Sequence, residues 1–330
     1  MIKVIHFGLG PIGCAMARLV AQRANLQIVG AVDIDPAKIG KDLGEVAGLG
    51  KNIGVKIMSS LEDVLQNTDA QIVVHTTASY FDVFENQILN ILGHKLNVVS
   101  TAEELSFPWH HNPKQAKRID DAAKKNGVSV LGTGINPGFL MDSLPLNLTA
   151  LSQNVESIDI RRAQNASTRR GPFQKKIGSG MTAEEFKAAM KTGRMGHVGL
   201  PQSMAMIFDA FGKKLAKYKQ KIVPVLAKKE IKTEHFTVPE GFCIGLKQTA
   251  KGLDENGIVF CTMTFVAFLD NKEDRDTIKI AGTPNLKVTL EGANGDIGTA
   301  AITINAIARV VNSPAGLVTM KDLPIVSCGQ

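Results

Sequence analysis

Short apolar runs alternate with amphipathic stretches through the first part of this chain, and no other feature constrains the fold as strongly. Five runs have the composition of buried strands: Lys3–Phe7, Leu26–Val32, Gln71–Thr76, Asn97–Thr101 and Val128–Gly132. Three intervening stretches have helical spacing of apolar residues: Gly13–Ala24, Val83–Leu92 and Pro113–Asn126. Apolar strands that alternate with helices form parallel βαβ units. The sequence therefore predicts an α/β fold that begins with a doubly wound parallel sheet.

The pattern changes after Gly138, where several apolar runs are longer and alternate in polarity. The predicted strands here are Val155–Arg161, Phe236–Val238, Gly257–Leu269, Thr277–Ile280 and Asn285–Glu291, with helices near Ala183–Thr192 and Pro201–Lys213. This pattern favours a second, α+β domain built on an open, largely antiparallel sheet. A last helical segment, Ile297–Val311, is expected to return to the first domain. The predicted division is 1–138, 139–296 and a C-terminal helix and tail, 297–330.

Gly8-Leu9-Gly10-Pro11-Ile12-Gly13 lies between the first predicted strand and the first predicted helix. A GxGxxG sequence in this position is the fingerprint of a Rossmann dinucleotide-binding unit. Gly8 permits the tight turn, Gly10 lets the backbone approach a pyrophosphate, and Gly13 lets the helix pack closely on the strand. We expect the whole turn, including Pro11 and Ile12, to form the phosphate site of the cofactor. The helix dipole and the exposed N–H groups, which Pro11 lacks, would hold the phosphates. The structural alternative is a tight strand–helix turn without a ligand.

Asp33 ends the second predicted strand, about 20 residues after Gly13, where such folds place an acidic residue on the adenine ribose. Its carboxylate would repel a 2′-phosphate, so NAD is favoured, although Lys38 and Lys41 lie close enough in sequence to leave NADP possible. The next loop, Thr76-Thr77-Ala78, follows the third predicted strand. Because ligands bind at the carboxyl ends of parallel strands, this loop either borders the cofactor or is a polar loop without contact.

Charge distribution argues against a nucleic-acid partner. The formal net charge is +7. The positive residues gather in a lysine run (Lys213, Lys214, Lys217, Lys219, Lys221) and an arginine region (Arg161, Arg162, Arg169, Arg170, Lys175, Lys176). Neither has interleaved aromatic residues or a nucleic-acid-binding module, and we interpret the lysine run as a solvated face. The arginine region is either an exposed strand and loop or the source of a carboxylate-binding arginine.

Cysteine spacing and hydropathy bear on metal sites and location. The four cysteines (Cys14, Cys243, Cys261, Cys328) form no CxxC pair, so we expect neither a metal site nor a disulfide framework. No apolar stretch approaches the roughly 20 residues of a membrane-spanning helix, and the first residues lack the pattern of a secretory signal. We expect a cytoplasmic protein without a membrane partner.

Two adjacent carboxylates, Glu103 and Glu104, follow the fourth predicted strand, Asn97–Thr101. Side chains of consecutive residues point apart, so we expect one of the two to face the crevice. Burial beside a cofactor would raise the pKa of such a glutamate and suit it to general acid–base catalysis. The alternative is a solvated helix start, where acidic residues favour the positive end of the helix dipole.

Two loops carry candidate substrate-binding residues. Thr133, Asn136, Pro137 and Gly138 follow the fifth predicted strand, and their polar groups and flexible glycine suit a crevice or a plain domain-crossing turn. His197 lies in the glycine-flanked segment Gly196–Gln202 before a predicted helix. This histidine either lines a substrate pocket or caps the helix.

Five segments together resemble a known family. They are GLGPIG, STAEELSFP, VLGTGINPGFLMD, GHVGLP and VVNSPAGLVTMKDLP, and the likeness extends from Lys3 to Pro324. The chain resembles 2,4-diaminopentanoate dehydrogenase and the native amine dehydrogenases, whose wider fold resembles dihydrodipicolinate reductase. The resemblance implies NAD(P)-dependent, reversible oxidative deamination of a small aliphatic amine or diamino acid, such as 2,4-diaminopentanoate, to a ketone and ammonia.

The resemblance also implies roles for individual residues. The water-activating glutamate of the family maps to Glu103 or Glu104, after the predicted strand Asn97–Thr101; we favour Glu104. His197 matches a pocket-lining position, and Asn136 to Gly138 match the crevice loop. The sequence does not select an arginine for a substrate carboxylate. We expect a homodimer, because an open sheet commonly needs a partner face.

Other functions remain as alternatives at this stage. A cyclic-imine reductase of the dihydrodipicolinate reductase type would have a histidine–lysine pattern that this chain does not clearly contain. A semialdehyde dehydrogenase would need a cysteine nucleophile, and no cysteine lies between Cys14 and Cys243. A non-catalytic NAD-binding sensor is a third alternative, against which the acidic pair favours an enzyme.

Overall fold

The computed structural model describes residues 1–193 and 195–329, which form two compact units. Unit 1 contains residues 1–139 together with the chain from Asn294 onward, and unit 2 is Leu140–Ala293. The sequence places these limits after Gly138 and Asp296. Within the described residues, no helix has both the length and the hydropathy needed to cross a membrane.

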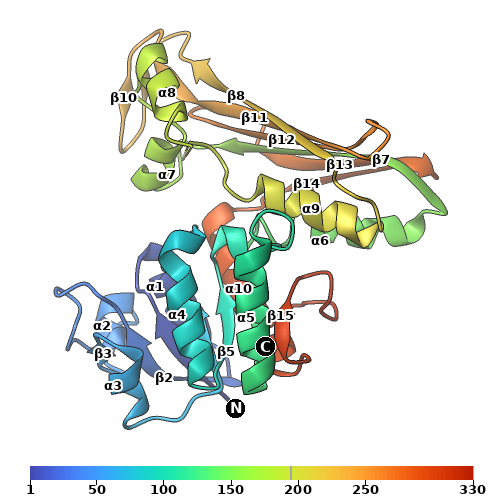
Figure 1. The fold of residues 1–330 in the computed structure, drawn as a ribbon. Helices are drawn as coiled ribbons and strands as arrows, with labels where there is room; N and C mark the ends of the chain where they lie inside the picture. Colours follow the sequence, from blue (N-terminus) through green and yellow to red (C-terminus); the bar gives the residue numbers. More distant parts are fainter. Residues whose placement is uncertain (194, 330) are drawn as a thin grey trace. The chain divides into compact units, whose positions relative to one another are not determined.

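Unit 1 is built on a seven-stranded sheet in which every pairing is parallel (Figure 1). The strand order is β15-β6-β5-β4-β1-β2-β3. The strands are β1 (Ile2–Phe7), β2 (Leu26–Val32), β3 (Ile57–Met58), β4 (Ile72–His75), β5 (Asn97–Ser100), β6 (Ser129–Gly132) and β15 (Gly316–Val318). Strand order reverses between β1 and β4, as in a doubly wound sheet. The prediction of a parallel Rossmann sheet is confirmed.

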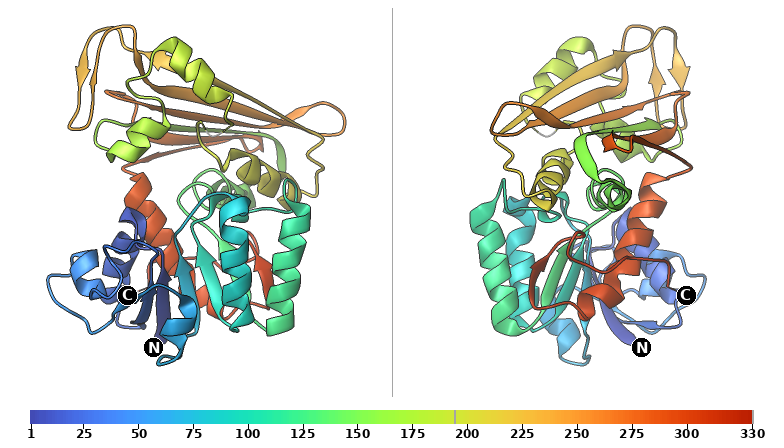
Figure 2. Two further views of the ribbon diagram at one scale, coloured as in Figure 1. Left: turned by 60° about the vertical axis from the view of Figure 1, so that its left-hand side comes forward. Right: turned by 90° about the vertical axis from the view of Figure 1, so that its right-hand side faces the viewer.

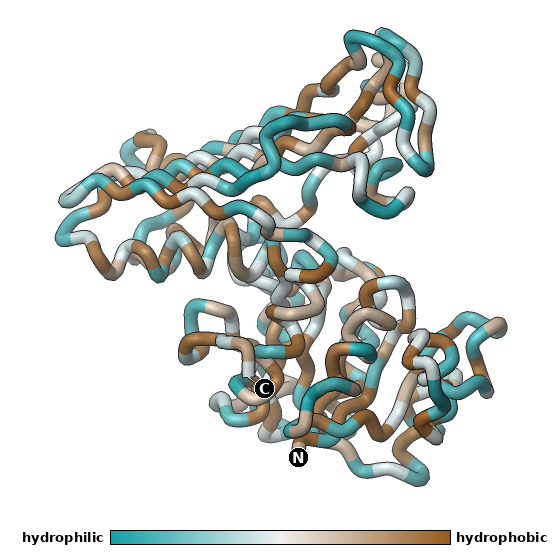
Figure 3. The backbone as a smooth tube through the Cα atoms, turned by 180° about the vertical axis from the view of Figure 1, so that it is seen from behind, coloured by the Kyte–Doolittle hydropathy of each residue, from teal (hydrophilic) through white to brown (hydrophobic). Residues whose placement is uncertain are grey.

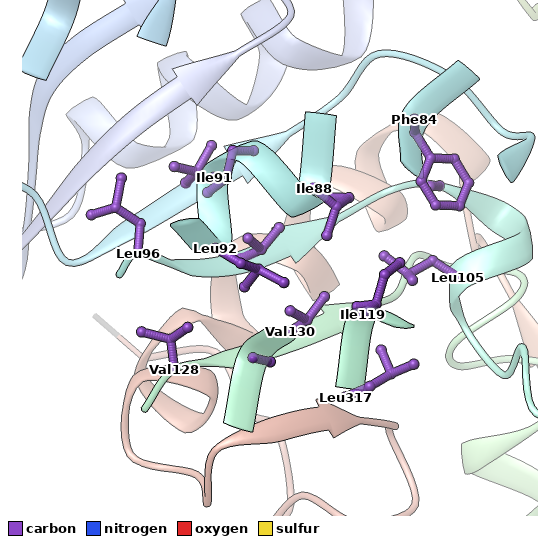
Figure 4. Close-up of a cluster of buried hydrophobic side chains, with 14 of the residues drawn as sticks. Phe84, Ile88, Ile91, Leu92, Leu96, Leu105, Ile119, Val128, Val130 and Leu317 are labelled. Carbon is purple, nitrogen blue, oxygen red and sulfur yellow. The ribbon is translucent and has the colours of Figure 1, made fainter. Parts of the chain in front are cut away.

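Helices cover both faces of this sheet (Figure 2). The long helices are α1 (Pro11–Ala21), α4 (Phe81–Gly93), α5 (Pro113–Asn126) and α10 (Gly295–Val311), and the short ones are α2 (Leu43–Ala47), α3 (Leu61–Leu65) and the 3₁₀ turn η1 (Glu103–Leu105). Val4 packs in the cluster with α1 and α10, whereas its neighbour Ile5 packs in the cluster with α4 and α5. Alternate strand residues point to opposite faces, so each strand contributes to both clusters. Figure 4 shows the second cluster, which also contains Leu105 of η1.

Unit 2 contains a six-stranded sheet in the order β14-β13-β7-β12-β11-β8. Its strands are β7 (Asn154–Asn165), β8 (Lys217–Leu226), β11 (Cys243–Leu253), β12 (Val259–Phe268), β13 (Arg275–Thr283) and β14 (Leu286–Glu291). Only the β7–β12 pairing is parallel among the described strands of this sheet, which confirms the largely antiparallel prediction. Hydrophilic and hydrophobic residues mix along much of this unit (Figure 3), with strict alternation in β14 and an almost wholly apolar β12. Helix α9 (Leu200–Ala210) packs on β11 and β12, beside α6 (Ser143–Leu148).

The remaining elements of unit 2 are η2 (Thr149–Leu151), α7 (Gly171–Lys176), α8 (Ala183–Met190) and a two-stranded sheet of β9 (Ile231–Lys232) and β10 (Thr237–Val238). The predicted strand Phe236–Val238 is therefore wrong as a member of the large sheet. Strand β8 contains part of the lysine run, and Lys217, Lys219 and Lys221 are exposed as expected. The sequence does not predict this strand. Its first half has lysines at alternate positions, as edge strands often do, and only its second half is apolar.

The arginine region is not simply exposed. Arg161 is half-buried and pairs with Glu273. Arg162, the next residue of β7, is 2% exposed and pairs with Asp276 at 3.0 Å, while its other terminal nitrogen donates to the Ala293 carbonyl. Adjacent strand residues face opposite sides, so one of two sequence-adjacent arginines enters the interior.

Candidate functional site

The site of unit 1 is organised by the carboxyl ends of four neighbouring strands. Phe7, His75, Ser100 and Gly132 are paired in register across β1, β4, β5 and β6. The segments that follow these four residues contain nearly all the residues that the sequence selects. Parallel strands thus bring together the glycine turn, the threonine loop, the acidic pair and the Thr133–Gly138 loop.

The glycine turn has little room for side chains. Gly8 has φ +93°, and an added Cβ would lie 2.7 Å from the Thr76 carbonyl oxygen. A Cβ on Gly13 would overlap the Gly8 carbonyl and lie 2.7 Å from Thr76 Oγ1. Gly10 has nothing within 4 Å of such an atom. The first and third glycines are therefore required by packing, whereas Gly10 keeps the backbone open to a ligand.

Helix α1 begins directly at this turn, with Pro11 at its first position and Ile12 next. Gly10 is the N-cap residue and supplies no side-chain hydrogen bond to the helix. Amides in the first turn of a helix have no intrahelical partner. Together with the helix dipole, they form an arrangement that can hold a phosphate.

Asp33 lies beside the glycine turn at the end of β2. It is 8% exposed, and its Oδ2 accepts a hydrogen bond from the Leu9 amide at 2.7 Å. Its Oδ1 accepts from the Asp35 amide at 2.8 Å, and Lys38 Nζ lies 3.3 Å from Oδ2. Partial burial lowers the pKa of Lys38, but hydrogen bonds and charges from Asp33 and Asp35 outweigh burial and raise it overall. The site therefore combines an acidic residue with a firmly protonated lysine.

The threonine loop is tied to the glycine turn. Thr76 Oγ1 donates to the Gly8 carbonyl at 2.6 Å, and the Thr76 amide donates to Phe7. Thr77 Oγ1 donates to Gln87 Oε1 of α4 at 2.6 Å. Ala78 follows as a half-buried residue. These bonds hold the loop at the point where strand order reverses, the usual ligand crevice of such sheets.

The two glutamates of the acidic pair open the 3₁₀ turn η1, and both are half-buried. Glu104 Oε2 accepts a hydrogen bond from the Phe81 amide at 2.8 Å, and the Glu104 amide donates to the Ser79 carbonyl. Burial raises the pKa of Glu104; the Phe81 amide opposes this effect, and the charges of Asp82 and Glu103 add to it. Phe81 is the only protein donor to this carboxylate in residues 1–193 and 195–329. One oxygen is thus anchored, while the other has no donor among the residues that the structure describes.

Gly132 determines how η1 sits on the sheet, and the sequence did not single out this role. A Cβ on Gly132 would lie 2.6 Å from both the Leu105 carbonyl oxygen and the Ser106 amide nitrogen. The end of β6 therefore contacts the backbone of η1 directly. The only sequence signal is a glycine at the end of a predicted strand.

The loop after β6 folds onto itself. The Thr133 amide donates to the Ser100 carbonyl at 2.8 Å, and Gly138 has φ +124° with room for no side chain beside Thr133 Oγ1. Thr133 is 3% exposed, and its hydroxyl has no hydrogen-bond partner within the described chain. Asn136 is also buried, and Pro137 lies between it and Gly138.

His197 belongs to unit 2. Its backbone amide donates to Gln248 Oε1 at 2.8 Å, and its ring stacks edge-on against Phe265 at 5.1 Å. Its Nδ1 accepts from the amide of Gly199, the N-cap residue of α9, at 3.1 Å. The ring therefore helps order the start of this helix.

For metals, no cluster of three or more suitable side chains occurs in the part of the chain that the structure describes.

Comparisons with known proteins agree with this architecture. The model of the 2,4-diaminopentanoate dehydrogenase C-terminal domain matches residues 139–329, and that of the dihydrodipicolinate reductase N-terminus matches residues 2–131. The chain is 34% identical to 2,4-diaminopentanoate dehydrogenase of Acetoanaerobium sticklandii, over 98% of this chain and 94% of that protein. An amine dehydrogenase of Streptomyces virginiae is 27% identical over 51% of this chain and 47% of its own length.

Among solved structures, the amine dehydrogenase of Mycobacterium smegmatis has the same fold. Its TM-score is 0.88 at 23% identity, covering 99% of this chain and 97% of that structure. The family models and the full-length relative extend this agreement from fold to family. The chain belongs to the 2,4-diaminopentanoate dehydrogenase family and is an NAD(P)-dependent oxidoreductase that acts on amines.

Proposed function

We propose that the protein catalyses reversible oxidative deamination of a small aliphatic amine or diamino acid, with 2,4-diaminopentanoate as the first substrate to test. The products are the corresponding ketone and ammonia. The name of the full-length Acetoanaerobium sticklandii relative supports this substrate class. The single observation that carries the chemistry is the Glu104 carboxylate, anchored through one oxygen by the Phe81 amide and raised in pKa by burial.

A nicotinamide cofactor held by the glycine turn, Asp33 and the Thr76–Ala78 loop would supply a hydride acceptor, and loss of a hydride from the amine-bearing carbon would leave an iminium. Glu104 then takes a proton from water as the water oxygen bonds to the iminium carbon. Glu104 returns this proton to the nitrogen of the carbinolamine and accepts the proton of its hydroxyl as the C–N bond breaks, which releases ammonia and forms the ketone. A partly desolvated carboxylate suits both steps, because it stabilises the iminium charge and accepts a proton near neutral pH. Glu103 is the alternative base.

The cofactor is assigned to the glycine turn, Asp33 and the Thr76–Ala78 loop. The amides after Gly10 would hold the pyrophosphate, and Asp33 would accept hydrogen bonds from the adenine ribose. The carboxylate favours NAD, while Lys38, 3.3 Å from it, offers a positive charge to a 2′-phosphate. We therefore propose a preference for NAD with NADP as a second cofactor.

Substrate contacts in unit 1 are assigned to Thr133, Asn136, Pro137 and Gly138. A substrate contact of His197, which belongs to unit 2, stays a prediction from the sequence. Support comes from the buried Thr133 hydroxyl, which has no hydrogen-bond partner among the described residues. Arg161 and Arg162 already bind Glu273 and Asp276, so neither is assigned to a substrate carboxylate.

We also propose a homodimer in the cytoplasm. One face of the unit 2 sheet presents both signs of charge, in Asp159, Arg161, Glu273, Lys279 and Lys287. A face with both signs can be self-complementary across a two-fold axis. Light scattering of the purified protein tests the dimer.

The proposed location in the cytoplasm rests on the four free thiols, which suit a reducing compartment.

The enzymatic test follows NADH absorbance after NAD is mixed with 2,4-diaminopentanoate, and in reverse with ammonia, NADH and a small ketone. We expect reduction of NAD in the first assay and ammonia-dependent NADH oxidation in the second. Binding of NAD without turnover of any amine would instead indicate a sensor. Reduction of a cyclic imine without ammonia would favour the dihydrodipicolinate reductase type of reaction.

Glu104→Gln identifies the base. The amide oxygen of glutamine can still accept from Phe81, so the fold is preserved while the proton acceptor is lost. We expect kcat to fall by roughly 10²–10⁴-fold with unchanged NAD affinity. Glu103→Gln is the matched control, and loss of activity in that variant alone would assign the role to Glu103.

A further inference from the structure

A buried hydrogen-bond network lies directly beneath the acidic pair and centres on His75. The imidazole is fully buried at the end of β4. Its Nδ1 lies 2.8 Å from Ser100 Oγ, and its Nε2 lies 2.8 Å from Gln87 Oε1. Thr77 Oγ1 lies 2.9 Å from Nε2 and donates to the same Gln87 oxygen.

The partners fix the tautomer of His75. Gln87 Oε1 can only accept, so Nε2 carries the proton and Nδ1 accepts the hydrogen of the Ser100 hydroxyl. Burial lowers the pKa of His75 to about 4, so the ring is neutral under physiological conditions. The Ser100 oxygen in turn accepts from the Ala102 amide at 3.1 Å. Every polar atom of the ring therefore has a defined partner.

The network joins three segments whose relative positions matter for the proposed reaction. Thr77 belongs to the loop assigned to the cofactor, and Ala102 directly precedes the acidic pair. Gln87 lies on α4, whose first amide, that of Phe81, anchors Glu104. No charged side chain of the described residues takes part, and the fully buried imidazole does not reach the surface.

We propose that His75, Ser100 and Gln87 are positioning residues that hold Glu104 at a fixed place relative to the cofactor loop. This inference rests on the proposed deamination. Buried, fully paired networks rigidify their surroundings, and losing one member leaves another without a partner. A displacement of about 1 Å at a catalytic group can cost about 10²-fold in rate. The network is therefore expected to affect turnover more than cofactor affinity.

The test compares two serine-to-alanine variants in adjacent strands. Ser100→Ala removes the hydroxyl between His75 and Ala102. Ser129→Ala removes a hydroxyl that is also buried, at the start of β6, whose hydrogen bonds within the described chain go only to the carbonyls of Ser313 and Pro314. For Ser100→Ala we expect kcat to fall roughly 10–100-fold, NAD affinity to stay within about two-fold, and the acid limb of the kcat/KM pH profile to move. Ser129→Ala should change none of these.

A second pair of variants, both at Gln87, separates loss of positioning from misfolding. Gln87→Glu keeps an acceptor for His75 Nε2 and should retain most of the turnover, whereas Gln87→Leu should lose it as Ser100→Ala does. Equal kcat and pH profiles for Ser100→Ala, Ser129→Ala and wild type would overturn the positioning role and leave the deamination intact. If the wild-type protein turns over no amine, the proposed function fails first, and the inference fails with it.

Discussion

Gly132→Ala tests whether the end of β6 positions the acidic turn. The added Cβ would lie 2.4 Å from the Leu105 carbonyl carbon and 2.6 Å from both the Leu105 oxygen and the Ser106 nitrogen, where ordinary contact begins at 3.4 Å. Relief therefore requires η1 to move by about 1 Å. All three opposing atoms belong to the backbone, so no side-chain rotation can supply this movement. Overpacking of this kind typically costs about 1–3 kcal/mol.

Because η1 carries Glu103 and Glu104, the same movement displaces the proposed base. We expect kcat to fall roughly 10–100-fold, and the thermal midpoint of unfolding to fall by roughly 2–4 °C for each kcal/mol. The matched control is Gly134→Ala in the same loop, where the nearest atoms are at 3.4 and 3.5 Å. NADH absorbance and a thermal melt of both variants provide the assay. Wild-type kcat and melting in Gly132→Ala would refute the argument.

Three further predictions concern other parts of the molecule. Burial lowers the pKa of His6 and His75 to about 4. In the unfolded chain these histidines take up a proton near pH 6.5. The free energy of unfolding should therefore fall as the pH is lowered from about 6.5 to 4, by up to roughly 3 kcal/mol for each histidine. Thermal melts at pH 7 and pH 5 should show a smaller loss of stability for His6→Leu than for the wild type. An identical pH dependence in the two proteins would contradict this prediction. Asp33→Ser should increase use of NADP relative to NAD and Lys38→Ala should decrease it, as measured by kcat/KM; an unchanged ratio in Asp33→Ser would show that Asp33 does not meet the ribose. Arg162→Met should destabilise unit 2 by about 3–5 kcal/mol because it leaves Asp276 buried without its cation, whereas Arg161→Met should cost at most about 1 kcal/mol; equal denaturation midpoints would refute the distinction.

Unit 1 is largely readable from the sequence because its signals are local. Each central strand is a short apolar run, and the helices between them have regular apolar spacing. The glycine turn is also local, since Gly8, Gly10 and Gly13 lie within one βα connection. The short elements α2, β3 and α3 were not predicted, because a few residues give no clear periodicity.

Unit 2 was harder to predict because its strands mix charge with burial. Alternating lysines concealed β8, and β11 was not predicted at all. The adjacent arginines of β7 look alike in sequence, yet Arg161 is half-buried and Arg162 fully buried. Their difference depends on Glu273 and Asp276, more than a hundred residues away along the chain.

For the candidate site, the sequence alone determined which loops would meet, because parallel strands must end at the same edge of their sheet. It also determined the residue types there: glycines, an aspartate, threonines and two glutamates. Only the tertiary structure decided which carboxylate oxygen is anchored, which way His75 donates, and why Gly132 cannot carry a side chain. These features depend on contacts between strands and helices far apart in the chain, and such contacts leave no periodic signal in the sequence.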